Sequence, residues 1–172
     1  MTVVCAVLAI IGSENLARGF GNQEVQLTHL FFCLIQQPDS TVSMALKRLN
    51  SNIDQLKADS KTLLTTLPVS RPLNQTFFSK SYLDSAENAI ARTKSLGDEF
   101  TGSELLFLEC IKDSAILEVI NKNNLNANSL EQSIFEIRGQ GPVTGRRPEA
   151  AQESLQRFCK DLTSLARENK ID

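Results

Sequence analysis

The chain has 172 residues, of which 41% are hydrophobic and 22% charged, a composition typical of one or two globular domains and not of a disordered chain. Lys and Arg number 18 against 20 Asp and Glu, and this net charge of −2 gives no electrostatic reason to expect nucleic acid or an anionic membrane as a partner. One histidine and four cysteines without close spacing exclude a multi-histidine metal centre and a zinc knuckle, so we expect buried, reduced thiols.

The first element is an apolar run over residues 3–11. It could pass for the hydrophobic region of a signal peptide, but no Lys or Arg precedes it and no small-residue cleavage pattern follows. It is also too short to span a bilayer. We interpret the run as the first turns of a buried helix that continues through Leu16 and Ala17.

Helical periodicity dominates the next sixty residues. Apolar residues recur at i, i+3, i+4, i+7 and i+8 over 27–35, and Pro38 then ends the pattern. A second stripe over 42–49 is followed by Asn50, a residue that tolerates the left-handed conformation of a helix C-terminus. A third stripe covers 53–64. Because no segment alternates apolar and polar residues, the sequence predicts an all-α fold.

The pattern then recurs about 75 positions later. Gly21-Asn22-Gln23-Glu24 is answered by Gly97-Asp98-Glu99-Phe100, and the apolar positions of the helix over 27–35 are answered 76 residues on by Leu106, Phe107, Cys110 and Ile111. Asn50 corresponds to Asn124 after a two-residue deletion. This internal duplication predicts two four-helix repeats that pack as a pseudo-twofold bundle, since neither half can bury its apolar stripes alone.

The remaining segments complete the predicted organisation. A helix over 79–96 corresponds to the N-terminal helix. Residues 139–148 contain three Gly and two Pro, the composition of a linker. The helix after it has an apolar face without a counterpart in the repeat, so we expect it to dock beyond this chain. The predicted domains are a double-repeat domain at 1–138 (repeats at about 1–67 and 79–138), a flexible linker at 139–148 and a C-terminal helix at 149–172.

Catalytic motifs are missing from the sequence. It has no Walker-type phosphate loop, nucleophile elbow, zinc-protease motif or calcium loop. Asp98, Glu99 and Glu104 form a carboxylate cluster without a partner that would tune it for acid–base work. We therefore expect no enzyme activity, metal or cofactor in this chain. Thr101-Gly102-Ser103-Glu104 fits a capping box, and His29 is expected to be a partly buried polar residue at a helix start.

The second-half helix raises two alternatives. The repeat assigns Leu106, Phe107, Cys110 and Ile111 to the core and leaves Leu105 and Leu108 on an adjacent face. Either the helix is central and buried on both faces, or these leucines form an exposed strip beside Asp98 and Glu104. Such a strip would be a protein-binding groove whose acidic rim favours basic, extended segments.

These residues resemble the N-terminal domain of the Clp/heat-shock unfoldase family, and within it the ClpB type of disaggregase. The resemblance covers nearly the whole chain. It rests on 14–17, on 21–25 with His29-Leu30, on Gly97-Asp98-Glu99-Phe100 followed by 103–106, and on the tail at 136–139 and 155–172.

The resemblance implies a non-enzymatic module that captures unfolded or aggregated polypeptide and delivers it to an ATP-driven pore. It implies Asp98, Glu104 and the adjacent Leu105 as substrate-binding residues, to which the strip adds Leu108. Groove positions on the preceding helix fall on Asn88 and Arg92, which are polar.

The resemblance also implies a setting for the module. We expect an ATPase domain to follow Asp172, where ATP and magnesium would bind. The full-length protein would then be a hexamer in the cytoplasm, or in an organelle, that works with a DnaK-type chaperone. The isolated domain would be a monomer without nucleic-acid or membrane partners. The alternative is an adaptor-docking domain, as in ClpA, ClpC or ClpV.

Overall fold

The fold was analysed in a computed structural model, which describes residues 2–71 and 75–139. The regular elements of the described chain are helices, apart from two strands that pair in parallel, β1 (Glu24–Val25) and β2 (Phe77–Phe78). The predicted all-α class is confirmed. The strands were not predicted, because two residues are too few to show alternation. The helices are α1 (Thr2–Phe20), α2 (Leu27–Gln36), α3 (Thr41–Arg48), α4 (Ile53–Thr65), α5 (Lys80–Ser95), α6 (Ser103–Cys110), α7 (Ser114–Lys122) and α8 (Ala127–Arg138).

The predicted duplication is visible in the backbone. The turns after α1 and α5 place Gly21 and Gly97 at φ values of 75° and 71°, and those after α3 and α7 place Asn50 and Asn124 at 52° and 56°. These left-handed conformations suit Gly and Asn, and they end the helices at equivalent points of the two repeats. The left-handed conformation expected at Asn50 is confirmed.

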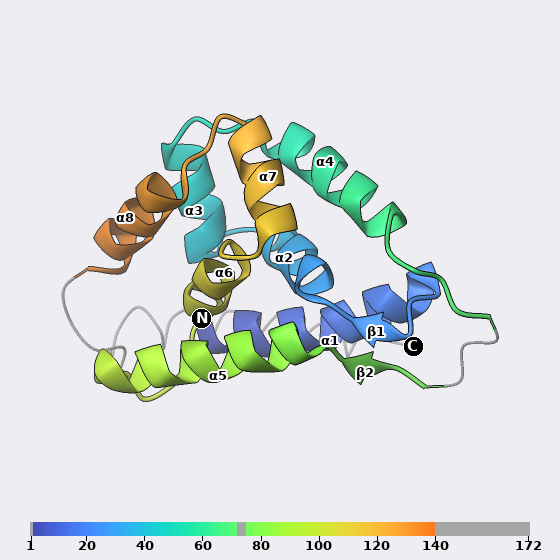
Figure 1. The fold of residues 1–172 in the computed structure, drawn as a ribbon. Helices are drawn as coiled ribbons and strands as arrows, with labels where there is room; N and C mark the ends of the chain where they lie inside the picture. The colour runs from blue at the N-terminus through green and yellow to red at the C-terminus, as the bar shows by residue number, and fades with distance from the viewer. Residues whose placement is uncertain (1, 72–74, 140–172) are drawn as a thin grey trace, which may run out of the picture.

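The two halves pack through each other's helices. α3 lies against α8, and α4 lies against α7 (Figure 1). At the centre, Phe31 of α2 stacks on its repeat equivalent Phe107 of α6, with ring centroids 5.6 Å apart. α6 contacts α1, α2, α3 and α5, and all eight of its residues are buried. The structure places α6 at the core of the molecule.

Segments at the C-terminal end complete the comparison with the predicted organisation. The described chain ends at Gly139, immediately after α8. The linker predicted at 139–148 and the helix predicted at 149–172 therefore lie outside the described residues, except for that first glycine. Of the cysteines in the described part, Cys110 is buried, Cys5 and Cys33 are half-buried, and all three are free thiols.

His29 caps the N-terminus of α2 from inside the protein. It is fully buried, and not partly buried as expected. Its Nδ1 accepts the backbone N–H of Gln26 at 3.0 Å, so the proton is on Nε2, which donates to Asn22 Oδ1 at 3.1 Å. The capping box thus lies at Gln26–His29. The box predicted at 101–104 is wrong, because α6 begins after Gly102, which has no capping side chain.

His29 should make the fold sensitive to mild acid. Burial lowers the pKa of its imidazole below the ordinary value of 6.5, since the charged ring would lose water. The unfolded chain therefore binds a proton before the folded chain does as the pH falls. Stability is complete above pH 6.5 and decreases as the pH falls toward the lowered pKa.

We expect His29→Gln to remove this pH dependence. Gln at this position can accept the Gln26 N–H, as capping boxes do, but it does not titrate. Urea unfolding of both proteins between about pH 7.5 and pH 5 measures the effect. If the two proteins lost stability in parallel over this range, the assignment of His29 as a buried neutral imidazole would be wrong.

Candidate functional site

The strip predicted at Leu105 and Leu108 is not on the surface. Their side chains are 0% and 2% exposed. The sequence argument assumed that one face of α6 is free, but α1, α2, α3 and α5 together surround the helix. The prediction of an exposed strip is wrong, and the alternative of a central helix is the one observed.

The predicted acidic rim is also inside the protein. The side chain of Asp98 is 1% exposed and that of Glu104 is 2% exposed, and both meet Arg138, the last residue of α8. Arg138 donates a hydrogen bond to Asp98 Oδ2, and its Nη1 lies 3.9 Å from Glu104 Oε1. We call Asp98, Glu104 and Arg138 the ionic triad. It joins the loop after α5, the start of α6 and the end of α8.

Glu104 lies in the first turn of α6, and its side chain is buried. Burial is the main cause that raises the pKa of its carboxyl, and the nearby Arg138 opposes this. A side chain at Gly102 would meet the Glu104 carboxylate, which would have to move to make room for it. Among the described residues, the buried atoms Glu104 Oε2 and Arg138 Nη1 find no hydrogen-bond partner. The triad is therefore compact and shielded from water.

The exposed apolar surface lies on α1. The helix predicted there is confirmed, but its predicted burial is wrong. The fully buried positions of the helix hold small residues, among them Ala6, Ala9 and Ala17. The opposite face exposes large aliphatic side chains at i, i+3, i+4 and i+7, and we call them the α1 stripe. They are Val4, Val7, Leu8 and Ile11, with exposed fractions between 51% and 57%.

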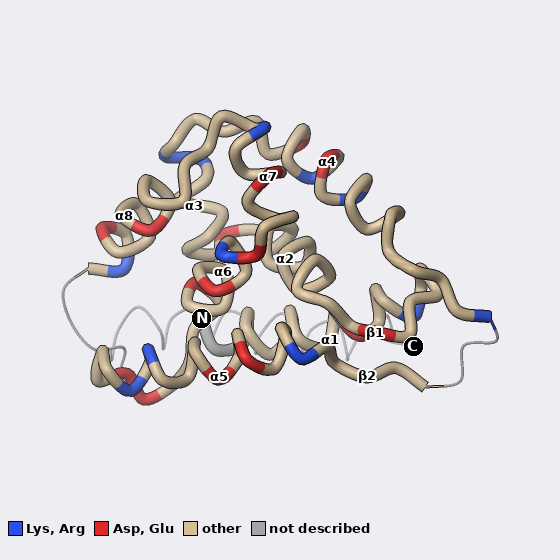
Figure 2. Tube along the Cα trace, viewed as in Figure 1, with Lys and Arg blue, Asp and Glu red and all other residues tan. Residues whose placement is uncertain are grey.

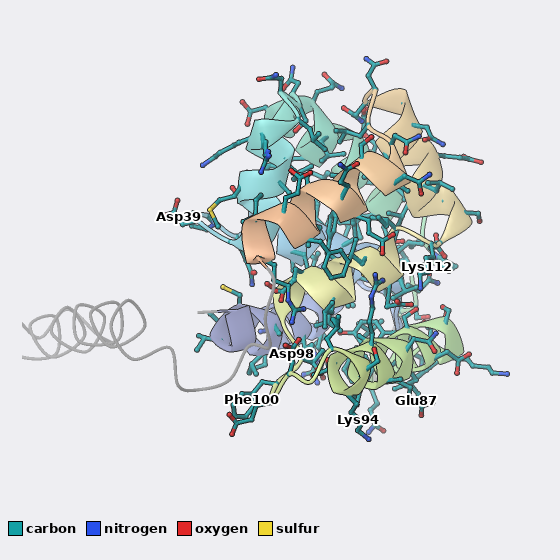
Figure 3. All side chains as sticks on the ribbon, turned by 90° about the vertical axis from the view of Figure 1, so that its left-hand side faces the viewer. Asp39, Glu87, Lys94, Asp98, Phe100 and Lys112 are labelled. Carbon is teal, nitrogen blue, oxygen red and sulfur yellow. The ribbon has the colours of Figure 1, made fainter. Side chains whose placement is uncertain are left out.

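α5 adds to this surface on the same side of the molecule. Leu83 and Ile90 of α5 and Phe100 of the following loop are about half exposed. Both views place α1 and α5 along one side, below α6 (Figures 1 and 3). The two helices are joined by a 3.1 Å hydrogen bond between the Tyr82 hydroxyl and Ser13 Oγ. We call the α1 stripe together with Leu83, Ile90 and Phe100 the basal surface.

The basal surface is almost free of charge on the α1 side. Residues 2–13 contain no charged side chain, and Glu14, the first one, accepts hydrogen bonds from Arg18 at 2.7 Å and Thr76 at 3.1 Å (Figure 2). The exposed charges of α5 are balanced. They are Lys80, Asp84, Glu87 and Lys94.

The resemblance implied two polar groove positions, Asn88 and Arg92, and only Asn88 is exposed. Arg92 points to α8, where it pairs with Glu131 and lies 5.1 Å from the centre of the Phe135 ring. It ties α5 to α8 and is only partly exposed. Asn88 is exposed on α5. Sequence reasoning did not identify Ile90 and Leu83 as the apolar contributors from this helix.

A hollow of about 150 Å³ lies beside β1 and is lined by Asn22, Glu24, Leu67 and Phe77, among others. In the part of the chain that the structure describes, no three His, Cys, Asp or Glu side chains are placed to hold a metal ion. No described helix combines the length and hydropathy needed to cross a bilayer.

The described chain is thus a helical double repeat with a half-exposed aliphatic face on α1. Residues 6–124 match the family described as the "Clp repeat (R) N-terminal domain", and the chain belongs to this family.

Relatives in sequence are bacterial ClpB chaperones. The chain is 31% identical over 166 residues to chaperone protein ClpB of Prochlorococcus marinus, an alignment that covers 95% of this chain and 19% of that protein. It is 30% identical over 166 residues to ClpB 1 of Synechococcus elongatus, with 95% and 19% covered. The chain therefore spans about a fifth of these relatives.

Relatives in structure share the fold at low identity. The Hsp104 N-terminal domain of Candida albicans superposes with a TM-score of 0.75 at 16% identity, over 83% of this chain and 94% of that one. A ClpV N-domain in complex with a VipB peptide superposes with a TM-score of 0.61 at 18% identity, over 81% and 88% of the two chains.

Proposed function

We propose that this chain is the non-catalytic, polypeptide-binding N-domain of a ClpB-like disaggregase, and that it captures unfolded segments on the basal surface. The observation that supports the proposal is the α1 stripe. Four large aliphatic side chains expose more than half of their area on two consecutive turns of one helix. Contiguous apolar area of this kind is typical of interaction sites in monomeric proteins.

The apolar surface suits clients that are defined by exposed hydrophobic residues and not by sequence. Apolar burial supplies affinity in proportion to the area removed from water, without a required hydrogen-bonding pattern. The site residues proposed from the sequence therefore change. Leu105 and Leu108 are buried in the core, and we propose Val4, Val7, Leu8, Ile11, Leu83 and Ile90 as the residues that contact the client.

The proposal extends to the full-length protein of which this chain would be one domain. An ATPase domain beyond this chain would bind ATP and magnesium, within a hexamer that acts with a DnaK-type chaperone in the cytoplasm or an organelle. The sequence here offers no Walker-type loop, so we assign no nucleotide binding to it. Adaptor docking is the competing function, which the ClpV N-domain complex with a VipB peptide illustrates on the same fold.

We expect the double substitution Val7→Ser with Ile11→Ser to weaken binding of an unfolded model protein by at least about tenfold, because two aliphatic side chains no longer lose water on binding. Binding is measured by titration against reduced, carboxymethylated lactalbumin. The helical circular dichroism should stay unchanged, since both side chains are half-exposed.

Val69→Ser is the matched control, because Val69 is equally exposed but lies in the connection after α4. It should bind the client as the parent does. Equal binding by all three proteins would refute the proposed surface. Weak binding to many unfolded proteins supports client capture, whereas saturable binding to a single folded partner would favour adaptor docking.

A further inference from the structure

We infer that the loop between α5 and α6 binds an extended segment of the client as an additional β-strand, through the main chain of Phe100 and Thr101. The inference rests on the proposed function and names the form in which the polypeptide is bound, an extended strand held by backbone hydrogen bonds. The first repeat contains the same arrangement within the chain itself.

The loops that follow α1 and α5 begin with the same geometry. Gly21 donates its N–H to Arg18 O at 3.0 Å, at the end of α1. Its equivalent Gly97 donates to Lys94 O at 3.1 Å, at the end of α5. In both repeats the next helix has its N-cap at the same distance along the chain from this glycine. The two loops are therefore equivalent residue by residue.

The first loop is a strand because another segment pairs with it. β2 lies parallel to β1, and the Ser79 N–H donates to Val25 O at 3.0 Å. Val25 therefore directs both its N–H and its C=O toward β2, since the two groups of a strand residue face the same neighbour. In the second loop Thr101 is the equivalent of Val25, and Phe100 is the equivalent of Glu24.

The second loop is not paired with a strand among the described residues. The equivalent of Phe78 is Thr2, which is already part of α1. Neither the backbone N–H nor the C=O of Phe100 and Thr101 forms a hydrogen bond with another described residue. Phe100 is 45% exposed and points away from the core (Figure 3). An incoming segment thus meets, in the second repeat, the main-chain groups that β2 uses in the first.

The loop lies at the end of the basal surface where α1 begins. Burial is the main cause that raises the pKa of the Cys5 thiol, and the charge of Glu104 adds to it, so α6 and α1 start close together. In the first repeat β2 leads directly into α5. A client strand at Phe100 leads in the same way to Val4, the first residue of the α1 stripe. One extended segment can pair with the loop and continue across the stripe.

The test uses a short peptide of alternating Val and Ser with a single Phe at its centre to fix the register. Versions with one N-methyl group at successive positions each lose one N–H donor and keep every side chain. Affinity for the parent chain should fall about two- to tenfold where the methyl group removes the N–H that faces Thr101 O. It should change little at the neighbouring positions, because their N–H groups face away.

Amide hydrogen exchange of the chain gives an independent measurement. The Thr101 N–H should exchange readily in the free parent and become protected by about tenfold or more when the peptide binds. The Phe100 N–H faces the other way, so its exchange should stay unchanged, as an internal control. The double variant Val7→Ser with Ile11→Ser should bind the peptide more weakly but keep the same dependence on N-methyl position.

The outcomes separate the two proposals. A parent chain that binds neither the peptide nor unfolded lactalbumin refutes the proposed function, and the inference with it. A parent that binds lactalbumin but not the peptide, or the peptide without dependence on N-methyl position, overturns only the inference. Protection of Thr101 in the free chain overturns it as well, because the chain itself would then supply the strand.

Discussion

Leu105→Asp is expected to abolish the folded state. Leu105 is fully buried in the helix that four other helices surround, so the new carboxylate would have neither water nor a basic partner. Burial of an unpaired charge together with loss of the leucine packing costs several kcal/mol, on the order of the whole stability of a domain of this size. Far-ultraviolet circular dichroism and thermal unfolding measure the loss.

Ile90→Asp is the matched control. Ile90 lies on α5, about half-exposed, so a carboxylate there stays in water and the helical signal should match that of the parent. The pair distinguishes a supporting residue from a contact residue. A folded Leu105→Asp variant that fails to bind clients would restore the groove expected from the sequence, and it would contradict the packing of α6.

The fold was predictable because several local signals agreed with one another. Stripes at helical spacing defined the helices, and Asn50 and Asn124 marked equivalent helix ends. The 76-residue offset placed Phe31 opposite Phe107 in the sequence comparison, and these two rings stack in the core. Where spacing, turn residues and repeat all point to the same element, the sequence determines it well.

The site was not predictable by the same reasoning. An apolar side chain on a helix can face a neighbouring helix or the solvent, and periodicity within one helix does not distinguish the two. α6 and the first half of α1 both have large apolar residues on more than one face. Neighbours cover α6 on every side, whereas α1 is covered on one face only. Such a helix is usually buried, which is why the sequence indicated burial for α1.

One signal in the sequence could have corrected the predicted burial of α1. The inward positions of α1 include Ala6, Ala9, Gly12 and Ser13, which are small, whereas its large residues occur between them. Small residues let α1 approach the core closely, as Gly12 does where a Cβ would meet Cys33 Sγ at 3.2 Å. Because small residues occupy the most buried positions of α1, four of its large aliphatic residues, Val4, Val7, Leu8 and Ile11, lie on the exposed face.

The ionic triad could not be predicted from the sequence for a different reason. Arg138 lies 40 residues from Asp98 and at the end of another helix, so no local pattern connects them. Asp98 and Glu104 were expected at a rim because charged side chains are rarely buried unless they are paired. The partner that permits their burial is visible only after α8 has been packed on α3.

Arg138→Ala should therefore be among the most damaging substitutions in the chain. The side chains of Arg138 and Asp98 are both at least 95% buried, so removal of the guanidinium takes a positive charge away from two buried carboxylates, Asp98 and Glu104. Loss of one partner from a buried pair costs about 3–5 kcal/mol. Urea unfolding should show this decrease in the free energy of unfolding, with the midpoint shifted to lower urea.

The double variant Asp98→Asn with Arg138→Gln should recover most of that loss. Its two amides can hydrogen-bond in the same space and leave Glu104 as the remaining carboxyl, whose pKa burial already raises. Replacing both members of a buried pair is often close to neutral. Such a recovery would show that Arg138→Ala lowers the free energy of unfolding because a buried carboxylate loses its ion pair, and not because side-chain volume is lost. If the single variant lost less than about 1 kcal/mol, like an exposed pair, solvent would reach Asp98, and the acidic rim would be open to clients after all.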